Sequence, residues 1–303
     1  MAALGLLAEP HIFPWLWLAF GLMTGSFLNV VIHRLPVMLD RQWRAQAHDM
    51  LADPASPAPA TEREPERYNL VVPRSACPHC GAPILAHQNI PVISYLVLGG
   101  RCARCKASIS PRYPVVELAT AVLSAAVVWR FGWHWQSVAA LFFTWALVAL
   151  TVIDFDHQIL PDIITLPVLW LGLLASLAWQ DGMVPPIPAD PASSILGAVA
   201  GYLSLWSVYW AFKLLTGKEG MGYGDFKLFG ALGAWMGWQM LPLILLLSAF
   251  TGAVVGIALI VVRGRDRNIP IPFGPYLAAA GWIALMWGPQ IVGGYLSVSG
   301  LDR

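Results

Sequence analysis

Eight apolar runs, each close to the length of a membrane span, dominate the 303-residue chain. A helix needs about 20 mostly apolar residues to cross the ~30 Å hydrocarbon core of a bilayer. The chain is 57% hydrophobic and 12% charged, whereas an average soluble domain carries about 25% charged residues. We therefore predict an all-α polytopic membrane protein with about eight transmembrane helices, near residues 12–33, 114–130, 137–153, 163–180, 194–215, 226–240, 241–262 and 272–292.

Two of these runs are weaker than the others. The sixth run is short and rich in glycine, and Pro242 follows directly after it. The sequence at 239–242 is compatible with a tight turn between two helices or with a kink inside one bent segment. The fourth run, residues 163–180, is the other weaker candidate for a span.

The distribution of Lys and Arg predicts the orientation. Short cytoplasmic loops carry an excess of these residues. If the N-terminus lies outside, sixteen of the eighteen fall on the cytoplasmic side, and only Arg130 and Arg303 lie outside. We therefore expect a multi-pass membrane protein, in contact with lipid, with its N-terminus outside and residues 34–112 in the cytoplasm.

The predicted cytoplasmic insert, residues 34–112, divides by composition. It follows the first transmembrane helix (1–33) and precedes a core of about seven helices (113–303). Residues 45–66 are rich in Ala, Pro and charged residues and have too few apolar side chains to form a packed core, so we expect a flexible linker. Residues 70–112 contain all four cysteines and are expected to form a separate module.

The cysteines form two Cys-x-x-Cys pairs with twenty-one residues between them: Cys77, Cys80, Cys102 and Cys105. This spacing is typical of a zinc ribbon, in which four thiolates close a structural tetrahedral site. Disulfides are the alternative, but a cytoplasmic module lies in a reducing compartment. The cysteines alone are also compatible with an iron–sulfur cluster. His79 and His87 are spare donors that we assign to the surface.

Asp154 and Asp225 each lie where an apolar run meets a polar stretch, at one predicted membrane depth. A charged side chain in the hydrocarbon core costs roughly 2.5–3.5 kcal/mol on insertion scales, so such residues usually function or pair. Two adjacent carboxyls share a proton, and the ionised one activates water while the protonated one polarises a carbonyl. The pair therefore predicts aspartyl proteolysis.

Each acid also has a purely structural interpretation. Asp156, His157 and Asp162 compete with Asp154, but Asp156 would point about 200° away from it on a helix. Asp162 follows Pro161 and suits the N-terminus of a new helix. Asp225 follows the glycine-rich loop Gly222-Tyr223-Gly224, and a helix beginning at or just after it would make this acid an ordinary cap. The pairing of the acids favours the catalytic interpretation.

Two other classes of protein remain open at this point. Intramembrane acids beside glycine-rich helices suit a transporter that relays protons or binds a cation. Against a transporter, the acids lie at the membrane edge, and the two halves of the chain show no internal repeat. A scaffold that assembles secretion machinery through its insert would leave both aspartates dispensable.

Four ordered segments carry a specific resemblance to a known family: residues 25–36, the four-cysteine insert, residues 153–162 and Gly222-Tyr223-Gly224-Asp225. Together they closely resemble the bacterial prepilin peptidases of type IV pilus and type II secretion systems. The similarity spans nearly the whole chain except residues 45–66 and 181–192.

The resemblance implies an inner-membrane aspartyl protease whose catalytic residues match Asp154 and Asp225. Its substrates would be prepilins and pseudopilins, whose basic leader is cleaved after a Gly on the cytoplasmic side. Many members of the family also methylate the new N-terminus with S-adenosylmethionine. Zn²⁺ would be structural, and no nucleic-acid partner is expected.

The sequence does not locate a methyl-donor site. A Gly-x-Gly-x-x-Gly turn is absent from the insert. By position, the candidates are Glu117 and the turn Gly99-Gly100-Arg101, which also suit an interfacial charge and a hairpin turn. The segment 270–275, rich in Pro and Gly, is a candidate lining of the substrate groove or a stiff helix start, and the cluster 263–267 is a candidate anion site or a positive-inside anchor.

Overall fold

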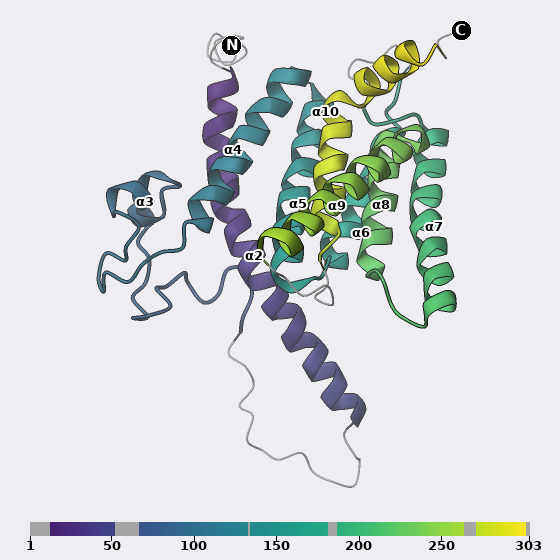
Figure 1. Cartoon of the computed structure of the whole chain (residues 1–303). Helices are drawn as coiled ribbons and strands as arrows, with labels where there is room; N and C mark the ends of the chain where they lie inside the picture. Colours follow the sequence, from purple (N-terminus) through teal and green to yellow (C-terminus); the bar gives the residue numbers. More distant parts are fainter. Residues whose placement is uncertain (1–12, 52–66, 133, 181–186, 264–270, 301–303) are drawn as a thin grey trace. The chain divides into compact units, whose positions relative to one another are not determined.

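The computed structural model describes residues 13–51, 67–132, 134–180, 187–263 and 271–300. Within these ranges, eight helices of at least 14 residues form most of the fold (Figure 1). They are α2 (Phe13–Leu51), α4 (Arg112–Phe131), α5 (Trp135–His157), α6 (Asp162–Ser176), α7 (Pro191–Thr216), α8 (Tyr223–Met236), α9 (Leu241–Arg263) and α10 (Gly274–Val298). Shorter pieces are η1 (Ala86–Asn89), α3 (Ile93–Val97) and η2 (Trp238–Met240).

Five helical stretches in the described residues are long and apolar enough to cross a membrane. They are Trp15–Leu51, Arg112–Phe131, Trp135–His157, Pro191–Thr216 and Trp238–Val262. The helices α6 and α8 have 15 and 14 residues, fewer than the ~20 that a perpendicular span requires. The chain is therefore an all-α multi-pass membrane protein, and the number of eight spans stays a prediction.

The first helix differs from its prediction. We expected its span to end near residue 33, but α2 continues through Pro36 to Leu51. Residues 45–51 of the predicted linker are therefore helical, and residues 52–66 lie outside the described part of the chain. The extension is rich in good helix formers and has an i,i+4 ion pair, in which Arg44 Nε lies 2.9 Å from Asp40 Oδ2.

The chain divides into two compact units, one ending at Ala125 and the other beginning at Ala126. In the first unit, α2 and α4 approach closely through small residues. A Cβ added at Gly21 would lie 2.7 Å from the Ala121 Cα, and one added at Gly25 would lie 2.6 Å from the Glu117 Cα. Such contacts between small residues are typical of helix packing in membranes.

In the second unit, α8 is the central helix. It packs against α6, α7, α9 and α10, and most of its side chains are buried. The indole Nε1 of Trp235 donates to the Val168 carbonyl of α6 at 2.8 Å, and the Ser194 hydroxyl of α7 donates to the Ala234 carbonyl at 2.5 Å. These contacts fix α8, and with it the first turn that carries Asp225.

The ambiguous break near residue 240 is a turn between two helices. Gly237 has φ +79° and ends α8, η2 follows, and α9 begins at Leu241. The fourth run is also shorter than predicted, because α6 ends at Ser176 instead of residue 180.

Candidate active site and metal centre

Asp154 lies in the last turn of α5 and is only 5% exposed. The helix ends when Gln158 adopts a left-handed conformation, with φ 54°, and donates its N–H to the Asp154 carbonyl at 3.0 Å. The chain then reverses through buried Leu160 into α6. Asp154 is therefore buried although residues 155–158, which complete the end of α5, are exposed.

Asp225 is the third residue of α8 and is 7% exposed. We expected the helix to begin at or just after this residue, but it begins at Tyr223, and Gly222 is its N-cap. The Asp225 N–H donates to the Gly222 carbonyl at 3.2 Å. Asp225 therefore lies in the first turn, where unpaired backbone N–H groups favour a negative charge.

The second unit brings the two carboxyl groups together from helices seventy-one residues apart in the sequence. They are close enough for the charge of Asp154 to act on Asp225. Burial strengthens this like-charge interaction, because a protein interior screens charges less than water does. The arrangement therefore favours a single negative charge on the pair, as a shared proton requires.

The start of α10 closes one side of Asp154. A Cβ added at Gly274, the first residue of α10, would lie 2.6 Å from Asp154 Oδ2 and 3.1 Å from two methyl carbons of Leu160. A Cβ added at Gly224 would lie 2.7 Å from the Leu160 Cβ. Leu160 therefore packs against both the α8 loop and the start of α10.

Asp154 Oδ2 has an unusual environment. It is fully buried and makes no hydrogen bond of standard geometry among the described residues, although the backbone of Gly274 acts as a donor toward the same carboxyl group. Leaving a buried polar atom unpaired typically costs about 1–3 kcal/mol. Such an atom in a native structure therefore points to a reactive group or to a site for a ligand.

The neighbouring acids lie elsewhere. Asp156 is exposed, as its helical angle from Asp154 predicts. Asp162 occupies the first turn of α6, but it makes no capping hydrogen bond. Instead, both of its oxygens accept from Lys227 Nζ of α8 at 2.7 Å. Asp162 is therefore an acidic residue at a helix N-terminus, as the sequence predicts, and it does not act as a cap.

Aromatic and charged contacts hold the loop before Asp225. The Tyr223 ring packs against Tyr209 of α7, with centroids 5.3 Å apart, and against Phe226 at 5.5 Å. Lys213 Nζ donates to Glu219 Oε1 at 2.8 Å and to the Tyr209 hydroxyl at 3.2 Å. These contacts tie the glycine-rich segment to α7 through Glu219 and Tyr223, which lie among its glycines.

The first unit gathers all four cysteines. Their sulfur atoms lie within 4.8 Å of one another, and Cys77 Sγ is 3.8 Å from Cys105 Sγ. This distance rules out a disulfide bond between these two sulfurs. It matches the roughly 3.8 Å that separates two sulfurs bound to one tetrahedral ion at about 2.3 Å.

The two Cys-x-x-Cys pairs form equivalent knuckles. In the first, the Gly81 N–H donates to the Cys77 carbonyl at 2.9 Å; in the second, the Lys106 N–H donates to the Cys102 carbonyl at 3.1 Å. Gly81 and Lys106 have φ angles of 66° and 60°. The second knuckle therefore places a lysine in a left-handed conformation that favours glycine.

The pKa values of two thiols in the cluster are shifted in opposite directions, so without a metal the four sulfurs do not all ionise near neutral pH. Backbone hydrogen bonds from Cys105 and Arg104 lower the pKa of Cys102 to about 6. At Cys105, the Ala107 N–H favours the thiolate, but burial and the three other sulfurs outweigh it and raise the pKa to about 11. Four thiolates this close need a positive ion between them, so the residues fit a divalent metal.

Two family models match the parts of the chain that contain the two candidate sites. The family model for the bacterial peptidase A24 N-terminal domain matches residues 19–131, and the model for the type IV leader peptidase family matches residues 141–257. Relatives named prepilin leader peptidase/N-methyltransferase are 54% identical over 295 residues in Pseudomonas aeruginosa and 57% identical over 296 residues in Aeromonas salmonicida. The first alignment covers 97% of both chains, and the second covers 96% of this chain and 98% of its relative.

The chain belongs to the type IV leader peptidase family. A relative of the same name in Xanthomonas campestris is 48% identical and covers 93% of each chain. The first family model includes the four cysteines, and the second includes Asp154 and Asp225. No solved structure matches the chain.

The candidates for a methyl-donor site in this leader peptidase have structural roles. Glu117 is buried in α4, and its Oε2 accepts the Val92 N–H at 2.8 Å. Gly99 and Gly100 both have positive φ angles and connect α3 to the second knuckle. A role for either candidate in binding S-adenosylmethionine stays a prediction.

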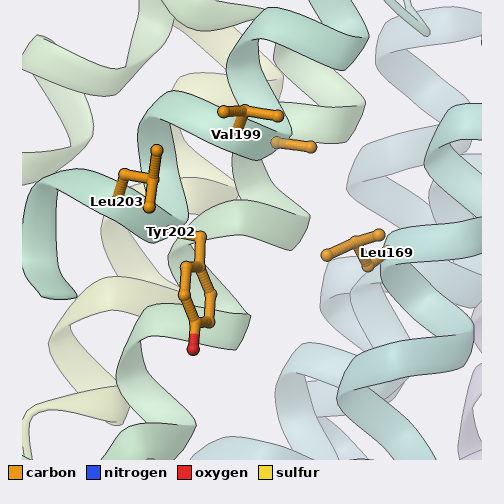
Figure 2. Close-up of a pocket in the computed structure, with 5 residues that line it drawn as sticks. Leu169, Val199, Tyr202 and Leu203 are labelled. Carbon is orange, nitrogen blue, oxygen red and sulfur yellow. The ribbon is translucent and has the colours of Figure 1, made fainter.

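An open hollow of about 330 Å³ lies between α6 and α7. Figure 2 shows Leu169 of α6 across from Val199, Tyr202 and Leu203 of α7. A nucleoside with a charged amino-acid tail needs several converging polar groups. The apolar lining therefore does not fit the methyl donor.

Three residues near the carboxyl pair could not be assigned from local sequence. Leu160 and Gly274 meet only because α8 and α10 converge on the end of α5. Lys227 and Asp162 are sixty-five residues apart. The sequence did indicate Gly274, because the segment 270–275 was a candidate lining of the substrate groove, and Gly274 lies at the site. Residue 270 lies outside the described part of the chain. Residues 264–267 of the basic cluster also lie outside it.

Proposed function

We propose that the chain is an intramembrane aspartyl endopeptidase that removes the basic leader of prepilins and pseudopilins after a Gly. The observation that carries this proposal is the meeting of two buried carboxyl groups, Asp154 and Asp225, from separate helices of the peptidase unit. The names of relatives more than 50% identical along nearly the whole chain support the choice of substrate.

In the proposed reaction, Asp154 and Asp225 share one proton. The ionised carboxylate accepts a proton from the attacking water, and the protonated one donates a hydrogen bond to the scissile carbonyl. The unpaired Oδ2 of Asp154 supports a role for that residue in contacting water or substrate. Gly222 at the N-cap of α8, with Tyr223 and Gly224 in its first turn, would then border an extended peptide.

The test compares three conservative variants. Asp154→Asn and Asp225→Asn should each lower leader cleavage of a co-expressed prepilin by roughly 10²–10⁴-fold, the usual contribution of acid–base catalysis. Asp156→Asn, at an exposed position two residues from Asp154, should cleave at the wild-type rate. Wild-type cleavage by Asp154→Asn or Asp225→Asn, with normal membrane insertion, would exclude the proposal.

We also propose the orientation of the chain. The N-terminus lies outside, and the insert 34–112 and the catalytic face lie in the cytoplasm of a bacterial cell, with residues 113–303 as the peptidase core. The support is the placement of sixteen of eighteen Lys and Arg on one side. A reporter enzyme that works only in the cytoplasm should be active when it is fused after Arg112, and one that works only in the periplasm should be inactive there. Activity of the periplasmic reporter would reverse the orientation.

Cys77, Cys80, Cys102 and Cys105 are proposed to hold one structural Zn²⁺. Four sulfurs complete a tetrahedral shell and leave no position for water, so the ion would stabilise the module instead of taking part in cleavage. A Cys77→Ser/Cys80→Ser variant should lose one equivalent of zinc, and His79→Ala should retain it. Elemental analysis that finds iron instead of zinc, or no metal in the wild type, would reject the assignment.

Cleavage is proposed to be followed by methylation of the new N-terminal amine with S-adenosylmethionine as the donor. The names of the relatives are the support for this step. Membranes that contain the wild-type protein, a prepilin and donor labelled in the methyl group should transfer label to the mature pilin. Cleaved but unlabelled pilin would restrict the chain to proteolysis.

A further inference from the structure

The cysteine module has an unusual charge pattern. Between residues 67 and 116 the chain contains six basic residues and no Asp or Glu: Arg67, Arg74, Arg101, Arg104, Lys106 and Arg112. Four thiolates around a divalent cation would not cancel this charge. The module therefore presents a positive surface without acidic groups to balance it locally.

The same module exposes large apolar side chains. Ile93, Leu96 and Val97 share one face of α3, because residues three and four apart are neighbours on a helix. Leu96 is 70% exposed and Val97 is 79% exposed. Leu85 and Ile90, just before α3, are exposed as well. Several large exposed apolar side chains on so small a module mark a binding face.

One attachment holds α3 beside a membrane-spanning helix. The N–H of Val92, the N-cap of α3, donates to Glu117 Oε2 at 2.8 Å. Glu117 lies in the second turn of α4, and Figure 1 shows α3 beside the first turns of that helix. Val92 has φ 58°, which is rare for a β-branched residue and indicates that surrounding contacts impose it.

A second attachment holds the beginning of the module against α2. Buried Arg34 donates from Nη1 to the Asn69 carbonyl at 2.9 Å and from Nη2 to the Pro73 carbonyl at 2.6 Å. Arg34 directly follows the apolar part of α2. The module is thus attached near its beginning to α2 and near its middle to α4.

We propose that the cysteine module lies on the bilayer surface, with the apolar face of α3 at the boundary between headgroups and acyl chains and its cations against anionic phospholipid headgroups. An apolar face beside basic side chains is the pattern of an interfacial membrane helix. Lipid is favoured over a soluble partner because both attachments keep the module beside the membrane at all times.

The test uses the full-length, metal-loaded protein in lipid nanodiscs. Leu96 is replaced by the photoreactive residue p-benzoylphenylalanine, and crosslinked products are identified by mass spectrometry. Lipid adducts are expected, with a higher yield when part of the phosphatidylcholine is replaced by phosphatidylglycerol. Arg101→Gln should reduce the phosphatidylglycerol-dependent gain by up to about fivefold, whereas Lys218→Gln, which removes the same charge from the α7–α8 loop, should leave it unchanged.

The other outcomes overturn the proposal. Crosslinks to other segments of the chain would mean that α3 packs on the protein itself, and crosslinks to a second copy would mean an oligomer interface. The absence of adducts from a variant with full metal content would mean that the face is solvated. If the Leu96 variant loses its metal, the same probe at Val97 decides between these outcomes.

Discussion

Two buried carboxylates, one in each unit, have opposite surroundings. In the first unit, Glu117 Oε2 accepts the Val92 N–H at 2.8 Å, and Ser26 and Asn29 lie within hydrogen-bonding reach of the same side chain. In the second unit, Asp154 Oδ2 makes no hydrogen bond of standard geometry among the described residues. The backbone of Gly274 is the donor beside this carboxyl group, and its charged neighbour is another acid, Asp225. A buried carboxylate surrounded by donors stabilises structure, whereas one left open beside a like charge is available for chemistry.

The largest effect that this comparison predicts comes from closing the open carboxylate. In Gly274→Ala, the new Cβ would meet Asp154 Oδ2 at 2.6 Å, so either α10 or the carboxyl group must shift. A displacement of about 1 Å at a catalytic group lowers rates by roughly 10²-fold. Leader cleavage, measured as initial rate on a prepilin in membranes, should fall by about that factor.

The matched control lies on the same helix. Gly294→Ala makes the same change in α10 where nothing lies within 4 Å of the added Cβ, so its rate should be that of the wild type. Equal rates for the two variants would mean that the contact of Gly274 with Asp154 has no part in catalysis.

The second prediction removes the satisfied carboxylate. Glu117→Ala leaves the strained Val92 N–H without its acceptor, whereas Glu117→Gln keeps an acceptor oxygen. The alanine variant should lower the local opening free energy by about 1–3 kcal/mol, measured by amide hydrogen exchange of residues 90–98. The glutamine variant should lose less than half as much opening free energy as the alanine variant. Equal losses in the two variants would contradict the role of the hydrogen bond.

The two sites also differ in how far sequence predicts them. The cysteines are close in sequence, and Cys-x-x-Cys spacing alone determines each knuckle, so their cluster was predicted correctly. The spans 114–130, 137–153 and 194–215 match α4, α5 and α7 within a few residues, because apolar length is a local property. The contacts of Asp154 with Gly274 and of Asp162 with Lys227 depend on how α5, α6, α8 and α10 pack, which no local pattern specifies.

The helix bounds show the same limit. The end of α2 was predicted from the change to polar composition at residue 34, but a change of solvent does not end a helix. Backbone hydrogen bonds continue through any run of good helix formers, and an internal Pro36 removes only one of them. Apolar composition therefore does not predict where this helix ends, and the membrane boundary near residue 33 stays a prediction.

The third prediction uses the difference between the two knuckles. Lys106 has φ 60° where the first knuckle has Gly81. A non-glycine residue in this conformation costs about 1 kcal/mol or more, so Lys106→Gly should strengthen zinc retention against a chelator by about fivefold. The reverse change, Gly81→Lys, should weaken it by a similar factor. If Lys106→Gly weakened zinc retention and Gly81→Lys strengthened it, or if neither variant changed it, the turn conformation would not limit the metal site.

The smallest expected effect comes from the ion pair between α6 and α8. Lys227 and Asp162 are 28% and 53% exposed, and exposed pairs contribute about 0.2–1 kcal/mol. Lys227→Met and Asp162→Asn should therefore each lower the cleavage rate by less than about fivefold. Each single variant removes the same ion pair. The double variant should therefore cleave at the rate of the slower single variant, and the two fold-losses should not multiply. A hundredfold loss in either single variant, with normal insertion, would instead place this pair in the catalytic site beside Asp225.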